Sequence, residues 1–157
     1  MPPARLIYTS RAAIRMTRRQ VQDLAVRARD KNRRLDVTGI LLFGGGRFLQ
    51  ILEGDEPTIS GLYDQIRADP RHTDCTLLTL GPASTRLFSG WRMALINLDM
   101  LDQMERRPLR MAARLSEALD GLELDRVIAT MIRDFVRLCG GKKQTQPETP
   151  RITGVRA

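Results

Sequence analysis

The 157-residue sequence predicts an α+β fold of the ferredoxin-like type, in which one sheet carries two helices on one face. Three observations favour this fold. Hydrophobic patterns typical of strands and helices follow one another in the order β-α-β-β-α-β-β. The second and third strand patterns carry apolar residues at both alternating positions, so both faces of the sheet should be covered. A strongly amphipathic helical pattern nearer the C-terminus is a candidate for the helix that covers the second face of the sheet.

The first strand and the first helix are predicted within residues 5–32. Residues 5–10 (RLIYTS) have the composition of a strand. Thr17 and Gln20 then have the spacing of a capping box, which places the start of a helix at Thr17. The helix should end near Asn32. Its apolar face, at the i, i+3, i+4 and i+7 positions, consists of Val21, Leu24, Ala25 and Ala28.

Two strands and a second helix should follow. Residues 37–43 and 47–53 indicate strands, and the three glycines at 44–46 join them. Because another strand follows these glycines, a hairpin turn with positive φ is favoured over a phosphate-binding loop, which needs a helix there. The sequence from Asp55 to Pro57 begins the second helix, and Asp69-Pro70 ends it. Its apolar face consists of Ile59, Leu62, Tyr63 and Ile66.

Residues 75–80 and 91–97 are the predicted fourth and fifth strands, so the sheet domain should occupy residues 1–98. A helical extension over residues 99–139 should contain one helix at Leu109–Leu119 and a second one after it. The apolar face of this second helix consists of Leu124, Val127, Ile128, Met131, Ile132 and Phe135. We expect the helix pair to cover the far face of the sheet; a hairpin that serves only dimerisation is the alternative.

The composition narrows the classes of function. The formal net charge is +8, but the arginines of the first helix mix with Asp23 and Asp30, which favours a solvated face over a nucleic-acid surface. Residues 140–157 are polar and basic, and we expect a disordered tail there. No apolar run reaches the roughly 18 residues of a membrane span, and no signal-peptide pattern is visible. Cys75 and Cys139 lack CxxC spacing, so we expect reduced thiols in a cytoplasmic protein.

Motifs for catalysis and for metal binding are missing from the sequence. His72 is the only histidine, so paired-histidine zinc motifs such as HxxxH cannot form. No GxSxG, Walker or dinucleotide-binding glycine pattern occurs. These absences weigh against an enzyme and against a metal site.

Two polar residues stand inside apolar strand patterns. Tyr8 is at the middle of the first predicted strand, and Gln50 is at the centre of the third. The first and third strands of a ferredoxin-like sheet are neighbours, so the two side chains could meet on one face. The alternative is ordinary packing, with the Tyr8 hydroxyl at the rim of the core and Gln50 bonded to nearby backbone. Asn32, at the predicted helix end, would ordinarily be a C-terminal cap.

Taken together, several segments resemble the BLUF family, the blue-light sensors that use flavin. They occur in order over residues 4–97 and agree with the family at its Tyr, Asn, Gln, Trp and Met positions. The matching segments are LIYTS (6–10), Asn32 followed by VTGILL (37–42), GRFLQILEG (46–54), DPRH (69–72) and FSGWRM (88–93).

The resemblance implies that a flavin, FAD or FMN, binds non-covalently between the two helices of the sheet domain. Tyr8 is then the electron and proton donor to the photoexcited flavin, and Gln50 bridges Tyr8 and the flavin edge. Asn32 hydrogen-bonds the polar edge of the ring in this interpretation. Arg71 and His72 lie near the polar side of the flavin or its phosphate.

Three more residues enter through the same resemblance. Lys31 belongs to the flavin site by position, although relatives have Asn or His there. Trp91 and Met93 are candidates for relaying the signal, because in the family either residue can approach the glutamine according to state. Both could also be ordinary core residues.

The resemblance further implies a photoreceptor that is not an enzyme, signals to a separate downstream protein and forms a homo-oligomer. The extension resembles that of short members without an attached output domain. A competing interpretation is an RRM-like nucleic-acid-binding module, which shares the order of elements and the basic charge. Such modules stack bases on exposed aromatic residues of the central strands, which here offer only Tyr8 and Phe48 among aliphatic residues. A hydrolase of the acylphosphatase type is disfavoured because no anion-binding loop is visible.

Overall fold

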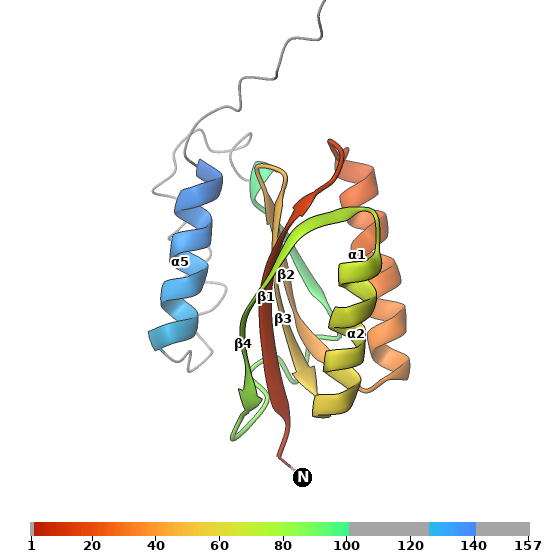
Figure 1. Cartoon of the computed structure of the whole chain (residues 1–157), viewed down its shortest axis with the longest axis vertical. Helices are drawn as coiled ribbons and strands as arrows, with labels where there is room; N and C mark the ends of the chain where they lie inside the picture. The colour runs from red at the N-terminus through yellow and green to blue at the C-terminus, as the bar shows by residue number, and fades with distance from the viewer. Residues whose placement is uncertain (1, 101–125, 141–157) are drawn as a thin grey trace, which may run out of the picture.

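The computed structural model describes residues 2–100 and 126–140. In chain order the elements are β1 (Ala4–Ala12), α1 (Arg18–Arg34), β2 (Thr38–Gly44), β3 (Arg47–Gly54), α2 (Glu56–Ala68), β4 (His72–Pro82), β5 (Ala94–Asn97) and α5 (Arg126–Gly140). They form three layers, with α1 and α2 on one face of the sheet and α5 on the other (Figure 1). The α+β order predicted from the sequence is confirmed.

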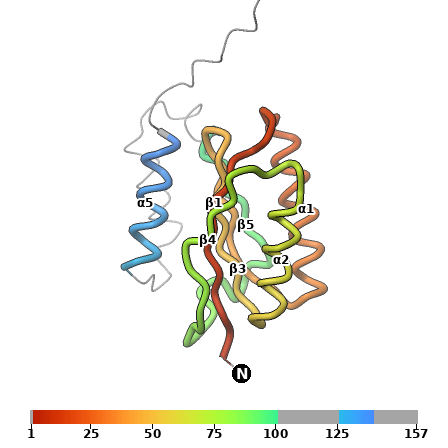
Figure 2. Tube along the Cα trace, viewed as in Figure 1, coloured from red at the N-terminus to blue at the C-terminus, as the bar shows by residue number. Residues whose placement is uncertain are grey.

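The sheet has five strands in the order β4-β1-β3-β2-β5. In Figure 2 it is seen edge-on, between α5 and the pair formed by α1 and α2. The predicted neighbours β1 and β3 lie at the centre and run antiparallel, whereas β5 joins the edge parallel to β2. Two boundaries differ from the prediction. β4 already begins at His72, whose segment pairs with the end of β1. β5 begins only at Ala94. The three carbonyls before it accept hydrogen bonds from the Gly39 backbone and from the side chains of Asn32 and Arg29, so residues 91–93 do not continue the strand pairing.

The capping signals explain where α1 begins. The Thr17 hydroxyl accepts a hydrogen bond from the Gln20 backbone at 3.2 Å, and the Gln20 side chain accepts one from the Thr17 backbone at 2.8 Å. Together these two bonds satisfy donors that the first helical turn leaves free. The helix extends past the predicted end at Asn32 to Arg34, and Leu35 is its C-terminal cap. Asn32 therefore lies inside the helix and is not a cap.

The glycine triplet forms the predicted hairpin turn. Gly45 and Gly46 have φ values of +55° and +71°, in the left-handed region that side chains with a Cβ rarely adopt. Gly44 has a different constraint, because a Cβ there would lie 3.1 Å from the sulfur of Cys139. The glycines thus allow the tight turn of the β2–β3 hairpin and also leave room for the last turn of α5 to pack against it.

Each face of the sheet has its own core. Tyr8, Phe48 and Leu52 point toward α1 and α2, and the partner elements contribute the predicted stripes, including Val21, Ala25, Ile59, Leu62 and Tyr63. On the opposite face, aliphatic residues of β1, β2 and β3 pack against α5; they are Ile7, Ile40, Leu42, Leu49 and Ile51. The expectation that the second face is covered is thus confirmed for α5.

The contact face of α5 differs in part from the prediction. Ile128, Ile132, Phe135 and Val136 are buried, at i, i+4, i+7 and i+8. Val127, assigned to this face from the sequence, is 56% exposed, because it lies one residue before Ile128 and therefore about 100° around the helix. The predicted helix at Leu109–Leu119, Leu124 and the tail over 141–157 lie outside the described residues.

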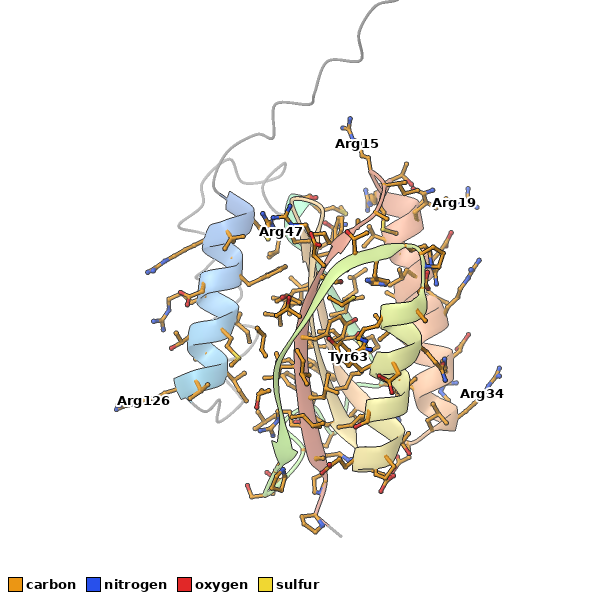
Figure 3. The ribbon with its side chains drawn as sticks, in the orientation of Figure 1. Arg15, Arg19, Arg34, Arg47, Tyr63 and Arg126 are labelled. Atoms are coloured by element: carbon orange, nitrogen blue, oxygen red, sulfur yellow. The ribbon has the colours of Figure 1, made fainter. Side chains whose placement is uncertain are left out.

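Many of the arginines project outward. Figure 3 shows Arg15, Arg19, Arg34 and Arg126 reaching away from the layers, whereas Tyr63 lies between α2 and the sheet. No helix within the described ranges is long and apolar enough to cross a membrane.

Candidate functional site

A cavity of about 180 Å³ lies between α1 and α2, with the sheet as its floor. Leu24 and Ala28 of α1 and Leu62 and Ile66 of α2 form apolar walls. Ala25, a member of the predicted apolar stripe of α1, is part of the core beside this cavity. All six residues predicted for the flavin site line the cavity: Tyr8, Lys31, Asn32, Gln50, Arg71 and His72.

Tyr8 and Gln50 meet on the floor of the cavity. They are directly paired across the antiparallel β1–β3 ladder, so their side chains leave the sheet on the same face. The Tyr8 hydroxyl donates a hydrogen bond to Gln50 Oε1 at 2.5 Å. The two residues are 1% and 5% exposed. Burial raises the pKa of the Tyr8 phenol well above its usual range, so the phenol is neutral and remains a donor.

Met93 and Trp91 lie on opposite sides of the sheet. Gln50 Nε2 donates to Met93 Sδ at 3.4 Å, and Met93 belongs to the core under α1 and α2. Trp91 packs instead against the core under α5, where its ring lies 5.8 Å from that of Phe88. The prediction that both occupy one strand is wrong, because the chain crosses from one core to the other between these two residues.

Asn32 connects the cavity to this crossing point. Its side chain is buried, and Nδ2 donates to the Arg92 carbonyl at 2.9 Å. Arg29, on the same helix, donates to the Met93 carbonyl at 3.3 Å. The α1 helix therefore holds the backbone of residues 92–93 from the side that also lines the cavity.

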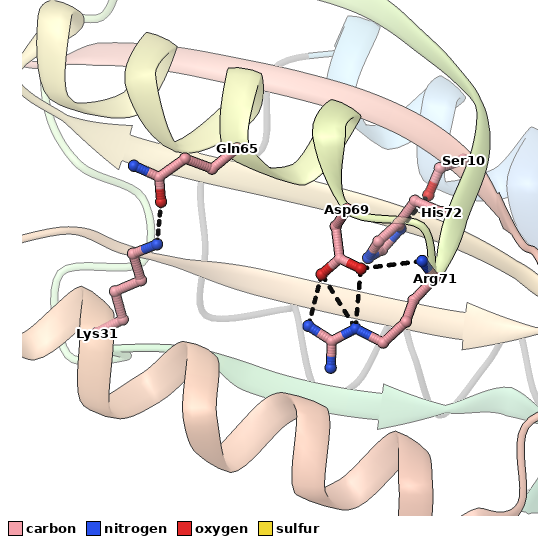
Figure 4. Close-up of polar contacts among 6 residues, drawn as sticks. All are labelled: Ser10, Lys31, Gln65, Asp69, Arg71 and His72. Carbon is pink, nitrogen blue, oxygen red and sulfur yellow. Dashed lines mark hydrogen bonds and ion pairs between the residues drawn. The ribbon is translucent and has the colours of Figure 1, made fainter.

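Charged and polar groups surround the mouth of the cavity. Lys31 of α1 donates a hydrogen bond across the gap to Gln65 of α2 (Figure 4). Arg71 forms a salt bridge with Asp69 at 2.6 Å, and its hydrogen bonds lower the pKa of the Asp69 carboxyl to about 2. The mouth thus carries Arg27, Lys31 and Arg71, with Asp69 as the ion-pair partner of the last.

His72 closes the end of the cavity beside β1. Its Nδ1 lies 2.9 Å from the Ser10 hydroxyl, at hydrogen-bond distance, and its ring is 4.9 Å from that of Phe48. Burial lowers the pKa of the imidazole, so the ring is neutral at neutral pH. His72 therefore contributes a neutral polar group to the site, next to the cationic Arg71.

Two features were missed from the sequence, one beside the cavity and one on the opposite face of the sheet. Tyr63 was assigned only to a helix stripe, yet its ring lies 5.1 Å from that of Tyr8, with the Arg67 guanidinium 5.6 Å from its centre. Glu53 is fully buried under the opposite face. The burial of Glu53 could have been predicted from the sequence. Strand alternation places its carboxylate on the same face of the sheet as Leu49 and Ile51, and that face was predicted to be covered.

The chemistry of the cavity suits a flat aromatic ring with a polar edge and an anionic chain. The walls are apolar, the floor offers amide and phenol groups, and the mouth is cationic. Among the described residues, no group of three or more His, Cys, Asp or Glu could hold a metal ion. The RRM-like interpretation is wrong, because Tyr8 and Phe48 are buried against the helices and cannot stack on bases.

Known proteins resemble this chain both in sequence and in fold. Residues 4–94 match the sequence model of the BLUF family, described as sensors of blue-light using FAD. The photoactivated adenylate cyclase subunit beta of Euglena gracilis is 36% identical over 97 residues, which cover 61% of this chain and 11% of that protein. The blue light- and temperature-regulated antirepressor BluF of Escherichia coli K12 is 37% identical over 93 residues, covering 59% of this chain and 23% of that protein.

Solved structures extend the likeness over most of the chain. The BlrP1 BLUF structure (Klebsiella pneumoniae) aligns with a TM-score of 0.68 and 31% identity, covering 90% of this chain and 94% of the other. BlrB, a BLUF protein in its dark state, aligns with a TM-score of 0.62 and 32% identity, covering 83% and 97%. The chain spans less than a quarter of the two curated relatives named above. Because the family match covers more than half of the sequence, the chain belongs to the BLUF family of flavin-dependent blue-light sensors.

Proposed function

We propose that this chain detects blue light with a FAD or FMN held in the cavity between α1 and α2, and that Tyr8 and Gln50 are its photoactive pair. The observation that carries the proposal is the buried 2.5 Å hydrogen bond between the Tyr8 hydroxyl and Gln50 Oε1. A phenol and an amide held this way on the cavity floor form a path by which an electron and a proton could pass from Tyr8 to a flavin bound in the cavity.

A flavin bound here supplies a strong oxidant on absorbing blue light. Tyr8 is the donor in our mechanism: it would give an electron to the flavin and a proton, along the existing bond, to Gln50. Both would return to Tyr8 by recombination, so that only the hydrogen bonds differ afterwards. The Gln50 amide has a donor end and an acceptor end, so it can pass a proton on and afterwards rotate or tautomerise. A rotated amide no longer donates to Met93 Sδ, and this change in hydrogen bonding is the stored signal.

The remaining cavity residues hold the cofactor in this proposal. Asn32 orients the polar edge of the ring, while Leu24 and Ile66 pack on its faces. Lys31 and Arg71 meet the phosphate at the mouth, next to the neutral His72. FMN and FAD both carry this phosphate, so extraction and chromatography of the flavin retained during expression is the way to distinguish them.

We further propose that residues 1–98 are the sensor and that the 99–139 extension carries the output to a separate protein, without catalysis by this chain. The packing of α5 on the second face supports this division. The two free cysteines support a reducing, cytoplasmic location, and a homo-oligomer remains our expectation.

The test is the absorption spectrum of the purified chain, reconstituted with FAD or FMN, before and after blue light. We expect a yellow protein with a flavin band that moves to longer wavelength on illumination and returns in the dark. A chain that stays colourless after careful reconstitution would remove the proposal. A yellow chain without a light-induced shift would remove the roles of Tyr8 and Gln50.

A further inference from the structure

A fully buried carboxylate lies on the opposite side of β3 from the cavity. Glu53 is 0% exposed and has the same strand parity as Leu49 and Ile51, so it points away from Gln50. Its Oε1 accepts hydrogen bonds from Arg5 Nε and from the Leu87 backbone N–H, both at 2.9 Å.

The second oxygen of Glu53 is also shared by two donors. Oε2 accepts from the Phe88 backbone N–H at 3.0 Å and from the Thr38 hydroxyl at 3.4 Å. The two oxygens of a carboxylate offer about four acceptor sites, so all of them are used here. An amide has only one acceptor oxygen, and its N–H₂ group would face a donor. Only a carboxylate fits this position.

Two of these four donors belong to the segment over residues 86–93, which links β4 to β5 without regular secondary structure. Near its start, Phe88 is buried in the core under α5. At its end, Met93 is buried in the other core and contacts Gln50. The 86–93 segment thus crosses from one core to the other, and Glu53 holds it on the α5 side.

The same segment is also held by groups from α1 and the α1–β2 turn. Asn32 and Arg29 bond to the carbonyls of Arg92 and Met93. The Asp36 carboxylate pairs with Arg86 at 3.1 Å and Arg92 at 2.8 Å, but it is exposed and these ion pairs are weak. These exposed ion pairs are therefore weaker attachments than the hydrogen bonds that the buried side chains of Glu53 and Asn32 make to the segment.

We infer that Glu53 is a positioning residue of the light switch. Its two hydrogen bonds to the backbone of Leu87 and Phe88 fix the 86–93 segment, so that Met93 Sδ meets the Gln50 amide and Trp91 packs on Phe88, while Arg5 and Thr38 hold the carboxylate itself in place. The inference rests on the proposed function for the roles of Gln50 and Met93. Glu53 touches neither the cavity nor Tyr8, so it acts only through the segment that it anchors. When the Gln50 amide changes its hydrogen bonds, the segment is free to shift only as far as this anchor allows.

The test compares the wild-type chain with Glu53→Gln and with a matched control, Glu56→Gln, which changes an exposed residue in the first turn of α2. The readout is the ¹³C-methyl resonance of Met93, assigned by its loss in Met93→Leu and measured with and without flavin. We expect Glu53→Gln to move or broaden this resonance even without flavin. With flavin, the light-induced absorption change should persist while its dark return rate changes roughly threefold to tenfold. Glu56→Gln should match the wild type in all three measurements.

The inference is overturned if Glu53→Gln has the same Met93 resonance and the same dark return rate as the wild type. If Glu53→Gln does not fold, Glu53→Asp keeps the charge but retracts it by one methylene, and the same shift of Met93 is required of it. The proposed function fails in a different way. It is contradicted if the wild-type protein shows no absorption change, whereas the Met93 resonance of the flavin-free protein tests Glu53 in either case.

Discussion

The amide nitrogen of Gln50 donates to the sulfur of Met93 at 3.4 Å, while the oxygen of the same amide accepts from the Tyr8 hydroxyl. Both ends of the amide are therefore used, which defines one orientation. Turning the amide over would place its oxygen against the Met93 sulfur, so that two acceptors would face each other. Met93 is thus the neighbour that responds to the orientation of Gln50, and it does so from the end of a segment anchored elsewhere.

Tyr8 and Gln50 should behave as a single unit. Tyr8→Phe keeps the ring but removes the proton, and Gln50→Leu keeps the volume nearly constant but removes the amide. Each variant should bind flavin and lose the normal light-induced shift, and the double variant should resemble either single one, because breaking one link stops the whole relay. Absorption spectra before and after illumination provide the measurement.

The matched control for this series is Tyr63→Phe. Tyr63 is a buried tyrosine whose ring lies 5.1 Å from that of Tyr8, but Gln50 accepts its hydrogen bond from Tyr8. Tyr63→Phe should therefore keep the shift. A complete photocycle in Tyr8→Phe would contradict the mechanism, even if the flavin is bound.

Asn32→Ala should weaken flavin binding. The substitution removes an amide that lines the cavity and also frees the Arg92 carbonyl from its 2.9 Å bond. The loss of such a bond costs about 1–1.5 kcal/mol, which corresponds to roughly a tenfold increase in Kd. Titration of the flavin-free protein, followed by flavin fluorescence, measures it. Gln22→Ala, on the exposed side of the same helix, is the control, and equal Kd values for the two variants would show that Asn32 is only structural.

The meeting of Tyr8 and Gln50 could be predicted from the sequence because it follows from the fold class. Once the β-α-β-β-α-β order is recognised, the first and third strands must be neighbours, and one polar residue at the centre of each strand then faces the other. The helix stripes could be predicted for the same reason, since periodicity and packing agree over most of α1 and α2.

The positions of Trp91 and Met93 could not be predicted in this way. They lie where the chain crosses between two cores, and no repeating pattern governs such a crossing. Their sides are set by bonds from Gly39, Asn32 and Arg29, together with those that Glu53 makes near the start of the segment, and all of these residues are distant in sequence. Val127 was misassigned because a broad apolar stripe fits more than one helix rotation, and the contact with the sheet decides between them.

The packing of α5 on the sheet should be needed for stability but not for the photochemistry. Phe135 is 6% exposed in the core under α5, so Phe135→Ala should lower the free energy of unfolding by about 3–5 kcal/mol. Leu138→Ala, at a position of the same helix that is 54% exposed, should stay within about 0.5 kcal/mol of the wild type. Urea unfolding measures both. Since the cavity lies on the other face, folded Phe135→Ala should keep its light-induced shift, and similar stabilities for the two variants would contradict the packing.

The last prediction concerns pH and His72. Burial lowers the pKa of its imidazole in the folded chain below the ordinary value of 6.5, with the Asp69 carboxylate opposing this effect and the Arg71 guanidinium adding to it. Well above pH 6.5 the ring is neutral in both the folded and the unfolded chain, so His72 adds no pH dependence there. As the pH falls below 6.5, the unfolded chain takes up a proton that the folded chain does not, and the free energy of unfolding decreases by at most about 1.4 kcal/mol per pH unit. Asp69, with a pKa of about 2, stays ionised throughout this range and does not contribute.

Denaturant unfolding between pH 5 and pH 8 should therefore show a steeper loss of stability in the wild type than in His72→Gln, which keeps a polar group beside Ser10 but cannot titrate. Parallel curves for the two proteins, or a wild type that gains stability on acidification relative to the variant, would show that His72 is not held neutral by the fold.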